Sequence, residues 1–143
     1  MSLPAVTPRV LFVDDDESIL LTLPRILEKN GWEIVTAKSF QEAVFKIHSV
    51  SFDLLLTDMN IDEEGDGLLV IAEMRRRQPD CLNFVMTGYP RFEPMLKAIA
   101  PPLQKYFFKP VELNDLISSL KEYLDKRKTS KPAGISLLDA PPN

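Results

Sequence analysis

The chain has 143 residues, a formal net charge of -4 at neutral pH and a hydrophobic fraction of 45%. This length suits one domain with a substantial core and leaves too little chain for a second folded domain. The acidic balance argues against a nucleic-acid-binding surface, and the short basic run at residues 126–128 does not reverse it.

The sequence also indicates the compartment. Cys81 is the only cysteine, so an intrachain disulfide cannot form, which fits a reducing cytosol. The chain shows neither an apolar stretch long enough for a membrane span nor the pattern of a signal peptide. We therefore expect a cytoplasmic protein that does not bind membranes.

Short apolar runs alternate with helical patterns along the chain. The runs have the length of buried strands and lie at Val10–Val13, Ile34–Ala37, Leu54–Thr57, Phe84–Thr87 and Tyr106–Phe108. Helical spacing of apolar residues, with capping and stop signals, predicts helices over residues 19–27, 40–47, 67–77, 92–100 and 113–124. Pro24 falls inside the first helix, where we expect a kink or a shifted start.

Five strands alternating with five helices predict an α/β fold with a single doubly wound domain. Its five-stranded parallel sheet would be covered on both faces, giving three layers, because right-handed crossovers place helices over each face. We expect this domain to span residues 8–126. Residues 127–143 turn polar and rich in helix breakers, which predicts a flexible C-terminal tail or linker.

Charged residues stand at the carboxyl ends of three predicted strands. Asp14 and Asp15 follow the first strand, Asp58 the third and Lys109 the fifth. In an open parallel sheet the ligand crevice lies outside these strand ends, so the side chains can share one pocket. Three carboxylates and one ammonium suit a divalent metal such as Mg²⁺ together with a phosphoryl group.

Each residue type has a chemical role in such a pocket. Asp58 is a candidate nucleophile for forming an acyl phosphate, while Lys109 and the hydroxyl of Thr87 can stabilise phosphoryl oxygens. Each also has a plainer interpretation: Asp58 as a turn residue, Lys109 as a surface lysine, Thr87 as part of an ordinary turn. The acidic stretch 14–17 can equally cap the following helix. Their joint occurrence at separate strand ends favours the functional interpretation.

The ordered set of motifs resembles the receiver domain of two-component response regulators. The matching elements are Val13-Asp14-Asp15, Asp58, Thr87-Gly88 and Tyr106-Phe107-Phe108-Lys109-Pro110, which span about residues 8–126. The resemblance implies a CheY-like, flavodoxin-like (βα)5 fold. It also implies a signalling domain that is not an enzyme beyond its own phosphotransfer and dephosphorylation.

The resemblance assigns a role to each site residue. Asp58 would be the phosphoacceptor, with Thr87 and Lys109 binding the phosphoryl oxygens. Mg²⁺ would be held by Asp14, Asp15 and Asp58 together with the backbone carbonyl of Asn60. Thr87 and Tyr106 would form the switch that remodels the face made by the fourth helix, fifth strand and fifth helix.

The same resemblance implies the partners. The phosphoryl donor would be a sensor histidine kinase or a histidine phosphotransfer protein, and an output partner or effector domain, which the sequence does not identify, would respond to the switch. A phosphorylation-dependent dimer is one form that this response can take. Direct binding of nucleic acid by this domain is not expected.

The chain departs from the family pattern after the acceptor. Receivers commonly carry a Met-Pro pair and then Asp-Gly, whereas here the proline is missing and Asp66-Gly67 arrives one residue late. Four extra acids fill the loop, which either alters metal affinity and kinase recognition or is simply a variable, solvated segment. Pro101-Pro102 replaces the small residues usual before the fifth strand, and Asn60 and Tyr89 occupy positions that tune dephosphorylation in the family.

Two rival functions remain open from the sequence. Residues 14–18 also fit the Asp-x-Asp-x-Ser/Thr form of haloacid-dehalogenase-like phosphatases, with Asp14 as nucleophile. That interpretation leaves Asp58 unexplained and lacks paired acids after Lys109. The other rival is a receiver-like interaction module that is no longer phosphorylated. A dinucleotide-binding fold is weaker, because five glycines form no Gly-rich phosphate loop.

Overall fold

The chain folds around one parallel five-stranded sheet. The computed structural model describes residues 7–98 and 103–130. The strands are β1 (Arg9–Val13), β2 (Glu33–Ala37), β3 (Leu54–Asp58), β4 (Leu82–Thr87) and β5 (Lys105–Phe108). The helices are α1 (Glu17–Glu28), α2 (Phe40–Ser49), α3 (Asp66–Arg77), the short 3-10 helix η1 (Pro90–Phe92), α4 (Glu93–Ala98) and α5 (Leu113–Ser130).

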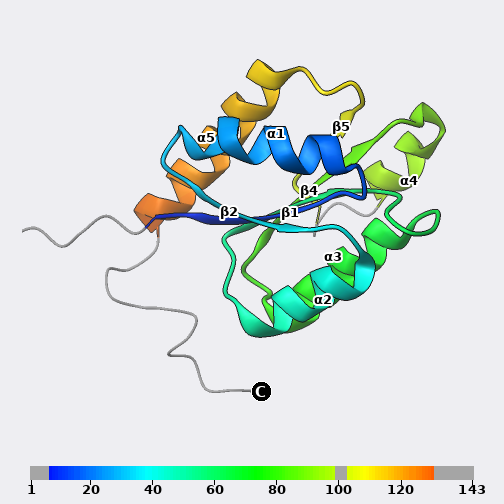
Figure 1. Cartoon of the computed structure of the whole chain (residues 1–143), viewed down its shortest axis with the longest axis horizontal. Helices are drawn as coiled ribbons and strands as arrows, with labels where there is room; N and C mark the ends of the chain where they lie inside the picture. Colours follow the sequence, from blue (N-terminus) through cyan, green and yellow to red (C-terminus); the bar gives the residue numbers. More distant parts are fainter. Residues whose placement is uncertain (1–6, 99–102, 131–143) are drawn as a thin grey trace, which may run out of the picture.

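The strands lie in the order β2-β1-β3-β4-β5, with every neighbouring pair parallel. Helices α1 and α5 cover one face of this sheet, while α2 and α3 cover the other (Figure 1). The order reverses direction at β1 and β3, so both strands that supply the predicted acids lie at this switch point. The predicted doubly wound three-layer α/β fold is confirmed.

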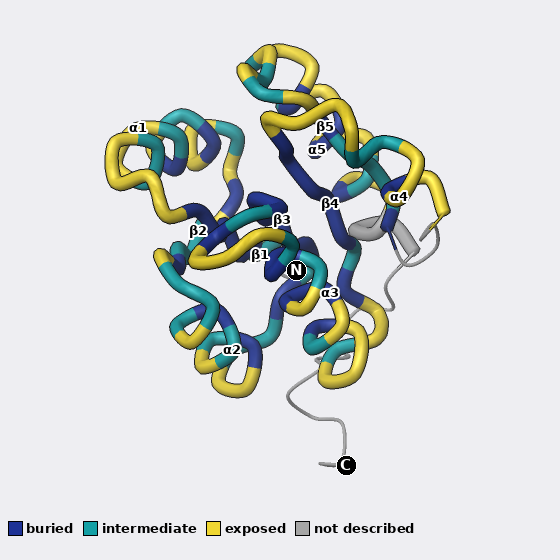
Figure 2. Tube along the Cα trace, turned by 90° about the vertical axis from the view of Figure 1, so that its right-hand side faces the viewer, coloured by how far each residue is buried: buried dark blue, intermediate teal, exposed yellow. Residues whose placement is uncertain are grey.

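Alternate residues of each strand feed two hydrophobic cores. Leu11, Leu55 and Val85 face the side covered by α2 and α3, whereas Phe12 and Leu56 face the side covered by α1 and α5. The central strand β3 is buried at every position, and the dark blue stretches of Figure 2 follow the sheet through the middle of the molecule. Burial on both faces explains why these strands read as continuous apolar runs.

Local signals set the helix starts. Asp16 caps α1 by accepting hydrogen bonds from the backbone N–H groups of Ser18 and Ile19, and Ser39 caps α2 by accepting one from Glu42. Helix α1 contains Pro24 as a buried residue and begins before it, at Glu17, so of the two predicted effects the shifted start is wrong and the kink stays a prediction. Pro24 is therefore an interior position of α1, seven residues after the helix begins.

The last two helices differ from their predicted ranges. The fourth helical pattern divides into η1 and α4, and α4 is described to Ala98. Residues 99–102, including Pro101-Pro102, lie outside the described residues. Helix α5 continues to Ser130, beyond the predicted domain boundary at residue 126. The predicted tail after Ser130 lies outside the described residues and stays a prediction.

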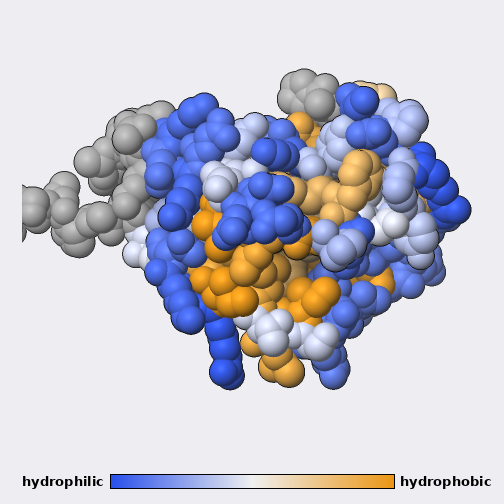
Figure 3. Space-filling view, turned by 90° about the horizontal axis from the view of Figure 1, so that it is seen from above, coloured by the Kyte–Doolittle hydropathy of each residue, from blue (hydrophilic) through white to orange (hydrophobic). Residues whose placement is uncertain are grey.

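The face that carries α1 and α5 keeps apolar surface. Figure 3 shows hydrophobic atoms gathered in the middle of this face with hydrophilic atoms around them. On α1, the side chain of Leu21 remains 68% exposed. Within the described residues, none of the helices is long and apolar enough to cross a membrane.

Candidate functional site

The carboxyl ends of three strands bring the predicted charged residues together. Asp14 and Asp15 follow β1, Asp58 ends β3, and Lys109 follows β5. One carboxylate oxygen from each of the three aspartates lies within 4.8 Å of the others. The sequence therefore predicted correctly that the residues at the ends of β1, β3 and β5, which are at least 43 positions apart along the chain, lie together.

Lys109 joins two of the three acids. Its Nζ donates hydrogen bonds to Asp14 Oδ2 and Asp58 Oδ2, each at 3.0 Å. Asp14 is fully buried, and its other oxygen accepts the Asp16 backbone N–H at 2.9 Å. Asp58 is 8% exposed, and its Oδ1 accepts the Asn60 backbone N–H at a longer 3.3 Å. Of these two acids, Asp14 is therefore the more completely held inside the protein.

The shared environment shifts the pKa values of the site. Burial raises the pKa of Asp58 above its usual value, although the hydrogen bond and charge of Lys109 oppose this. Partial burial, and then the charge of Asp14, raise the pKa of Asp15. Burial disfavours the protonated form of Lys109, but Asp58 and Asp14 outweigh it and raise the lysine pKa. The ionised carboxylates thus repel one another, and one lysine compensates them only in part.

This arrangement has the charge and the atoms that a hard divalent cation requires. Three ionised carboxylates against one ammonium leave a local excess of two negative charges, all presented on oxygen. Asp15 is exposed and Asp58 reaches the surface, which provides access from solvent. The donor set therefore fits Mg²⁺, and a cation would offset the repulsion between the carboxylates, which adds to the effect of burial in raising the pKa values of Asp15 and Asp58.

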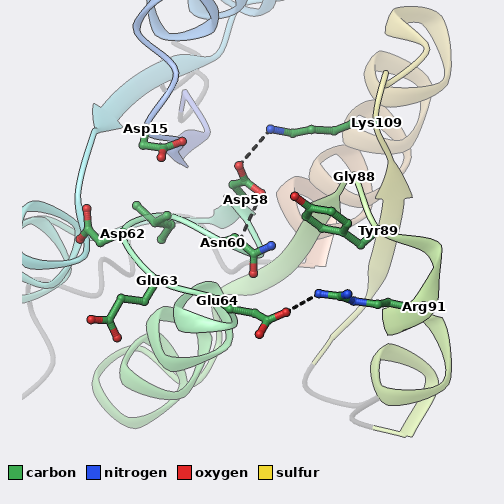
Figure 4. A pocket seen from close by; sticks show the side chains of 11 residues that line it. Asp15, Asp58, Asn60, Asp62, Glu63, Glu64, Gly88, Tyr89, Arg91 and Lys109 are labelled. Atoms are coloured by element: carbon green, nitrogen blue, oxygen red, sulfur yellow. Dashed lines mark hydrogen bonds and ion pairs between the residues drawn. The ribbon is translucent and has the colours of Figure 1, made fainter.

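A pocket opens in front of these groups. It is lined by Asp15, Asp58, Asn60, Ile61, Asp62, Glu63, Glu64, Gly88, Tyr89, Arg91 and Lys109. Figure 4 shows Asp58 facing Lys109, with Asp15 on the opposite side and the acidic loop after β3 along one border. At the rim, Arg91 Nη2 donates to Glu64 Oε1 at 2.5 Å, which ties this loop to η1. The pocket thus brings the acceptor candidate and an acid set that could hold a cation to one opening.

The two predicted switch residues lie beside the pocket and do not line it. Thr87 is fully buried at the end of β4, where its Oγ1 accepts the Tyr89 backbone N–H at 3.1 Å. Its carbonyl accepts the Lys109 backbone N–H at 2.8 Å. Tyr106 on β5 donates its hydroxyl to Glu93 Oε2 at 2.8 Å, at the start of α4. The tyrosine therefore connects the sheet to the helix next to the site.

Several contacts at the site were not predicted from the sequence. Asp66 is 7% exposed and organises the loop after β3 through three backbone hydrogen bonds. Glu64–Arg91 and Glu93–Tyr106 are pairs between segments 13 or more residues apart. Asp66 was visible in the sequence only as part of the late Asp66-Gly67 pair, whereas the two long-range pairs had no local signal.

A family comparison agrees with this geometry. The model of the response regulator receiver domain matches residues 10–121. The chain is 32% identical over 111 residues to the photosynthetic apparatus regulatory protein RegA of Cereibacter sphaeroides, covering 78% of this chain and 60% of RegA. It is 30% identical over 122 residues to the alginate biosynthesis transcriptional regulatory protein AlgB of Pseudomonas putida, covering 85% of this chain and 27% of AlgB.

Solved structures show the same similarity. A CheY-like receiver domain protein from Methanospirillum hungatei JF-1 has a TM-score of 0.78 and 31% identity, covering 88% of this chain and all of the other. The response regulator TrrA from Thermotoga maritima, solved in complex with Mg²⁺-BeF, has a TM-score of 0.71 and 28% identity, covering 82% of this chain and 99% of TrrA. The chain spans less than two thirds of the length of RegA and of AlgB. Its match to the family model over most of its length shows that it belongs to the response regulator receiver family.

Proposed function

We propose that Asp58 accepts a phosphoryl group from a phosphohistidine on a sensor histidine kinase or a histidine phosphotransfer protein. The observation that carries this assignment is the position of the Asp58 carboxylate, which lines the pocket, contacts Lys109 and lies beside Asp14 and Asp15. Membership in the receiver family supports the same role. We expect this exchange to take place in the cytoplasm.

The transfer is a displacement at phosphorus. A carboxylate oxygen of Asp58 attacks the phosphorus atom, a new P–O bond forms and the P–N bond to the donor histidine breaks. The histidine nitrogen leaves with the bonding electron pair and is free to take a proton. Lys109 already lies 3.0 Å from an Asp58 oxygen, so its ammonium is in place to offset charge on the phosphoryl oxygens.

The acid set supports a choice of metal ligands. Asp14, Asp15 and Asp58 would hold Mg²⁺, and the Asn60 backbone carbonyl would complete the protein ligands. When bound, the cation neutralises negative charge on the acceptor and the incoming phosphoryl group. Receiver TrrA, solved with Mg²⁺-BeF, supports this choice of ion. The remaining coordination positions are left to water and phosphoryl oxygen.

The structure disfavours the rival phosphatase, in which Asp14 is the nucleophile. Both carboxylate oxygens of Asp14 accept hydrogen bonds, from Asp16 and Lys109, and its side chain has no exposed surface. Asp58 retains exposed surface at the pocket. A displacement needs an approachable oxygen, so Asp58 is the better placed of the two acids.

Phosphorylation would then be read out through Thr87 and Tyr106. The Thr87 hydroxyl would donate to a phosphoryl oxygen, and Tyr106 would turn inward behind it and give up its hydrogen bond to Glu93. That bond joins β5 to α4, so losing it would remodel the face formed by α4, β5 and α5. The new bonds at the phosphoryl group favour one of two packings, which is a population shift.

The output would lie with a partner or an attached effector domain. RegA and AlgB are regulators longer than the matched region, which supports a domain that works within a larger regulatory protein or complex. A dimer formed on phosphorylation is one route by which the remodelled face would act. The domain itself would signal and catalyse only its own phosphotransfer and dephosphorylation.

Intact-mass spectrometry tests the proposal. The protein is incubated with acetyl phosphate and Mg²⁺, beside an Asp58→Asn variant and a sample without metal. The proposal predicts one added phosphoryl group that requires both Mg²⁺ and Asp58. An unmodified wild type that also stays unmodified with a phosphorylated histidine kinase would favour the interaction module. Label that survives Asp58→Asn would contradict the acceptor assignment.

A further inference from the structure

The loop between β3 and α3 is held from inside by one carboxylate. Asp66 Oδ1 accepts the Ile61 backbone N–H at 2.7 Å, and Asp66 Oδ2 accepts the N–H groups of Asp62 and Glu63 at 3.0 Å each. Hydrogen bonds to an ionised acceptor are roughly twice as strong as neutral ones. Three such bonds offset the cost of burying the Asp66 carboxylate, which is 7% exposed, and they fix three consecutive peptide units.

Two further contacts close the loop. Asn60 Oδ1 accepts the Gly65 backbone N–H at 2.7 Å, and Gly65 adopts the left-handed φ of +81° that glycine tolerates best. The Gly67 N–H donates to the Met59 carbonyl at 2.8 Å. These two contacts join the start of the loop, just after β3 (the acceptor strand, which ends at Asp58), to its end at the start of α3. Asp66 holds the middle of the loop.

The hydrogen bond from Ile61 also orients the carbonyl of Asn60. The N–H of Ile61 and the carbonyl of Asn60 belong to one peptide unit, which is planar and trans. In a trans peptide these two groups point in opposite directions, so a donor aimed at Asp66 turns the carbonyl away from Asp66. Asn60 and Ile61 line the pocket, and Asp66 does not.

We infer that Asp66 is a positioning residue for the metal site, which it serves by orienting the Asn60–Ile61 peptide so that the Asn60 carbonyl is presented to a divalent cation. The inference rests on the proposed metal-binding role of Asp14, Asp15 and Asp58. In this loop, which lacks the proline, the buried Asp66 carboxylate fixes three peptide units by hydrogen bonding.

The test compares Asp66→Asn with Glu63→Gln by isothermal titration with MgCl₂. Both variants remove one negative charge from the same loop, but Glu63 lines the pocket and Asp66 does not. Mutation of an outer group that orients a metal ligand typically lowers metal affinity about 10- to 100-fold. We expect at least a roughly tenfold higher Kd for Asp66→Asn, and a much smaller change for Glu63→Gln.

A second cation separates orientation from charge. Hexaamminecobalt(III) does not exchange its ammonia ligands, so it binds by electrostatics and outer hydrogen bonds, and its metal ion forms no coordination bond to a carbonyl oxygen. Asp66→Asn should therefore weaken Mg²⁺ binding while leaving hexaamminecobalt(III) binding close to that of Glu63→Gln. An equal loss for both cations would show a general loss of charge or structure and would overturn the inference.

A measurement on the wild type keeps the inference testable even where Asp66→Asn fails to fold. A cation bound to the Asn60 carbonyl polarises the peptide, so Mg²⁺ should move the ¹⁵N resonance of Ile61 more than those of Asp62 and Glu63. Equal shifts at the three amides would overturn the inference. A wild type that does not bind Mg²⁺ refutes the metal site itself, whereas wild-type affinity in a folded Asp66→Asn refutes only the role of Asp66.

Discussion

Replacing Gly67 by alanine should lower the stability of the protein, although alanine has the higher helix propensity. Gly67 is the second residue of α3, where alanine would ordinarily be favoured by about 1 kcal/mol. A Cβ built at Gly67, however, would lie 2.1 Å from the Asp58 carbonyl oxygen and 2.8 Å from both the Cα and the carbonyl oxygen of Met59. These are backbone atoms of the last residue of the acceptor strand and of the residue after it, so no side chain can move aside to make room.

The size of the effect follows from that contact. Relief requires either α3 or the backbone after β3 to move by roughly 1 Å, and overpacking of this kind typically costs about 1–3 kcal/mol, sometimes more. A contact of 2.1 Å with a backbone atom belongs at the upper end of that range, so after about 1 kcal/mol for the helix term is subtracted we expect a net loss of about 2 kcal/mol in the free energy of unfolding. For a domain of this size that corresponds to a fall of roughly 7 °C in Tm.

Urea unfolding followed by Trp32 fluorescence measures this loss, with two glycine controls. Gly88→Ala meets no heavy atom within 4 Å and should change stability by no more than about 0.5 kcal/mol. Gly65→Ala also has open space, but its φ of +81° costs about 1–2 kcal/mol with a side chain. A Gly67→Ala protein as stable as the wild type would refute the close approach of α3 to the acceptor strand.

Three further predictions concern the charges of the site. Lys109→Met should lower the stability of the metal-free protein by about 1–3 kcal/mol, because Asp14 and Asp58 lose their shared cation; unchanged urea unfolding without metal would contradict this. Because burial raises the pKa of Asp58, protons should compete with Mg²⁺ for this carboxylate while the pH is still above the ordinary carboxyl value of 3.8. A Mg²⁺ affinity, measured by titration calorimetry, that stays constant as the pH falls to that value would count against this prediction. The hydrogen bond to Glu93 raises the pKa of Tyr106, so Glu93→Ala should lower that pKa, and Glu93→Gln, which keeps an acceptor, should lower it less; identical tyrosine titrations by NMR in all three proteins would show that the bond is not formed in solution.

Strand positions were predictable because burial on both faces leaves a direct mark on the sequence. β3 is apolar up to Thr57 and buried throughout, and its predicted range differs from the observed one only by Asp58. β4 begins at Leu82, two residues earlier than predicted, because Leu82 and Asn83 pair with Leu54 and Leu55 of β3. Such pairing depends on a partner strand, which a local apolar pattern does not record.

The charged centre of the site was predictable for a similar reason. In a parallel sheet the carboxyl ends of the strands share one edge, so Asp14, Asp58 and Lys109 could be placed together from their positions after apolar runs. The structure places them within hydrogen-bonding distance. Roles at the phosphoryl group stay predictions, because they describe a state with the group attached.

The walls of the site could not be predicted in this way. Arg91–Glu64 and Tyr106–Glu93 join segments that meet only after the sheet has formed, and pairs between such distant segments follow no periodic pattern. The late position of Asp66-Gly67 was visible in the sequence, but its meaning was not. Only the folded loop shows that Asp66 turns inward to hold three peptide units.

The most direct test of the central claim locates the phosphoryl group on the chain. The protein is phosphorylated in the presence of Mg²⁺ and reduced with borohydride, which converts an aspartyl phosphate to homoserine, and its peptides are sequenced by tandem mass spectrometry. The account predicts homoserine at position 58, with Asp14 and Asp15 unchanged. Homoserine at position 14 would contradict the account and restore the phosphatase, in which Asp14 is the nucleophile.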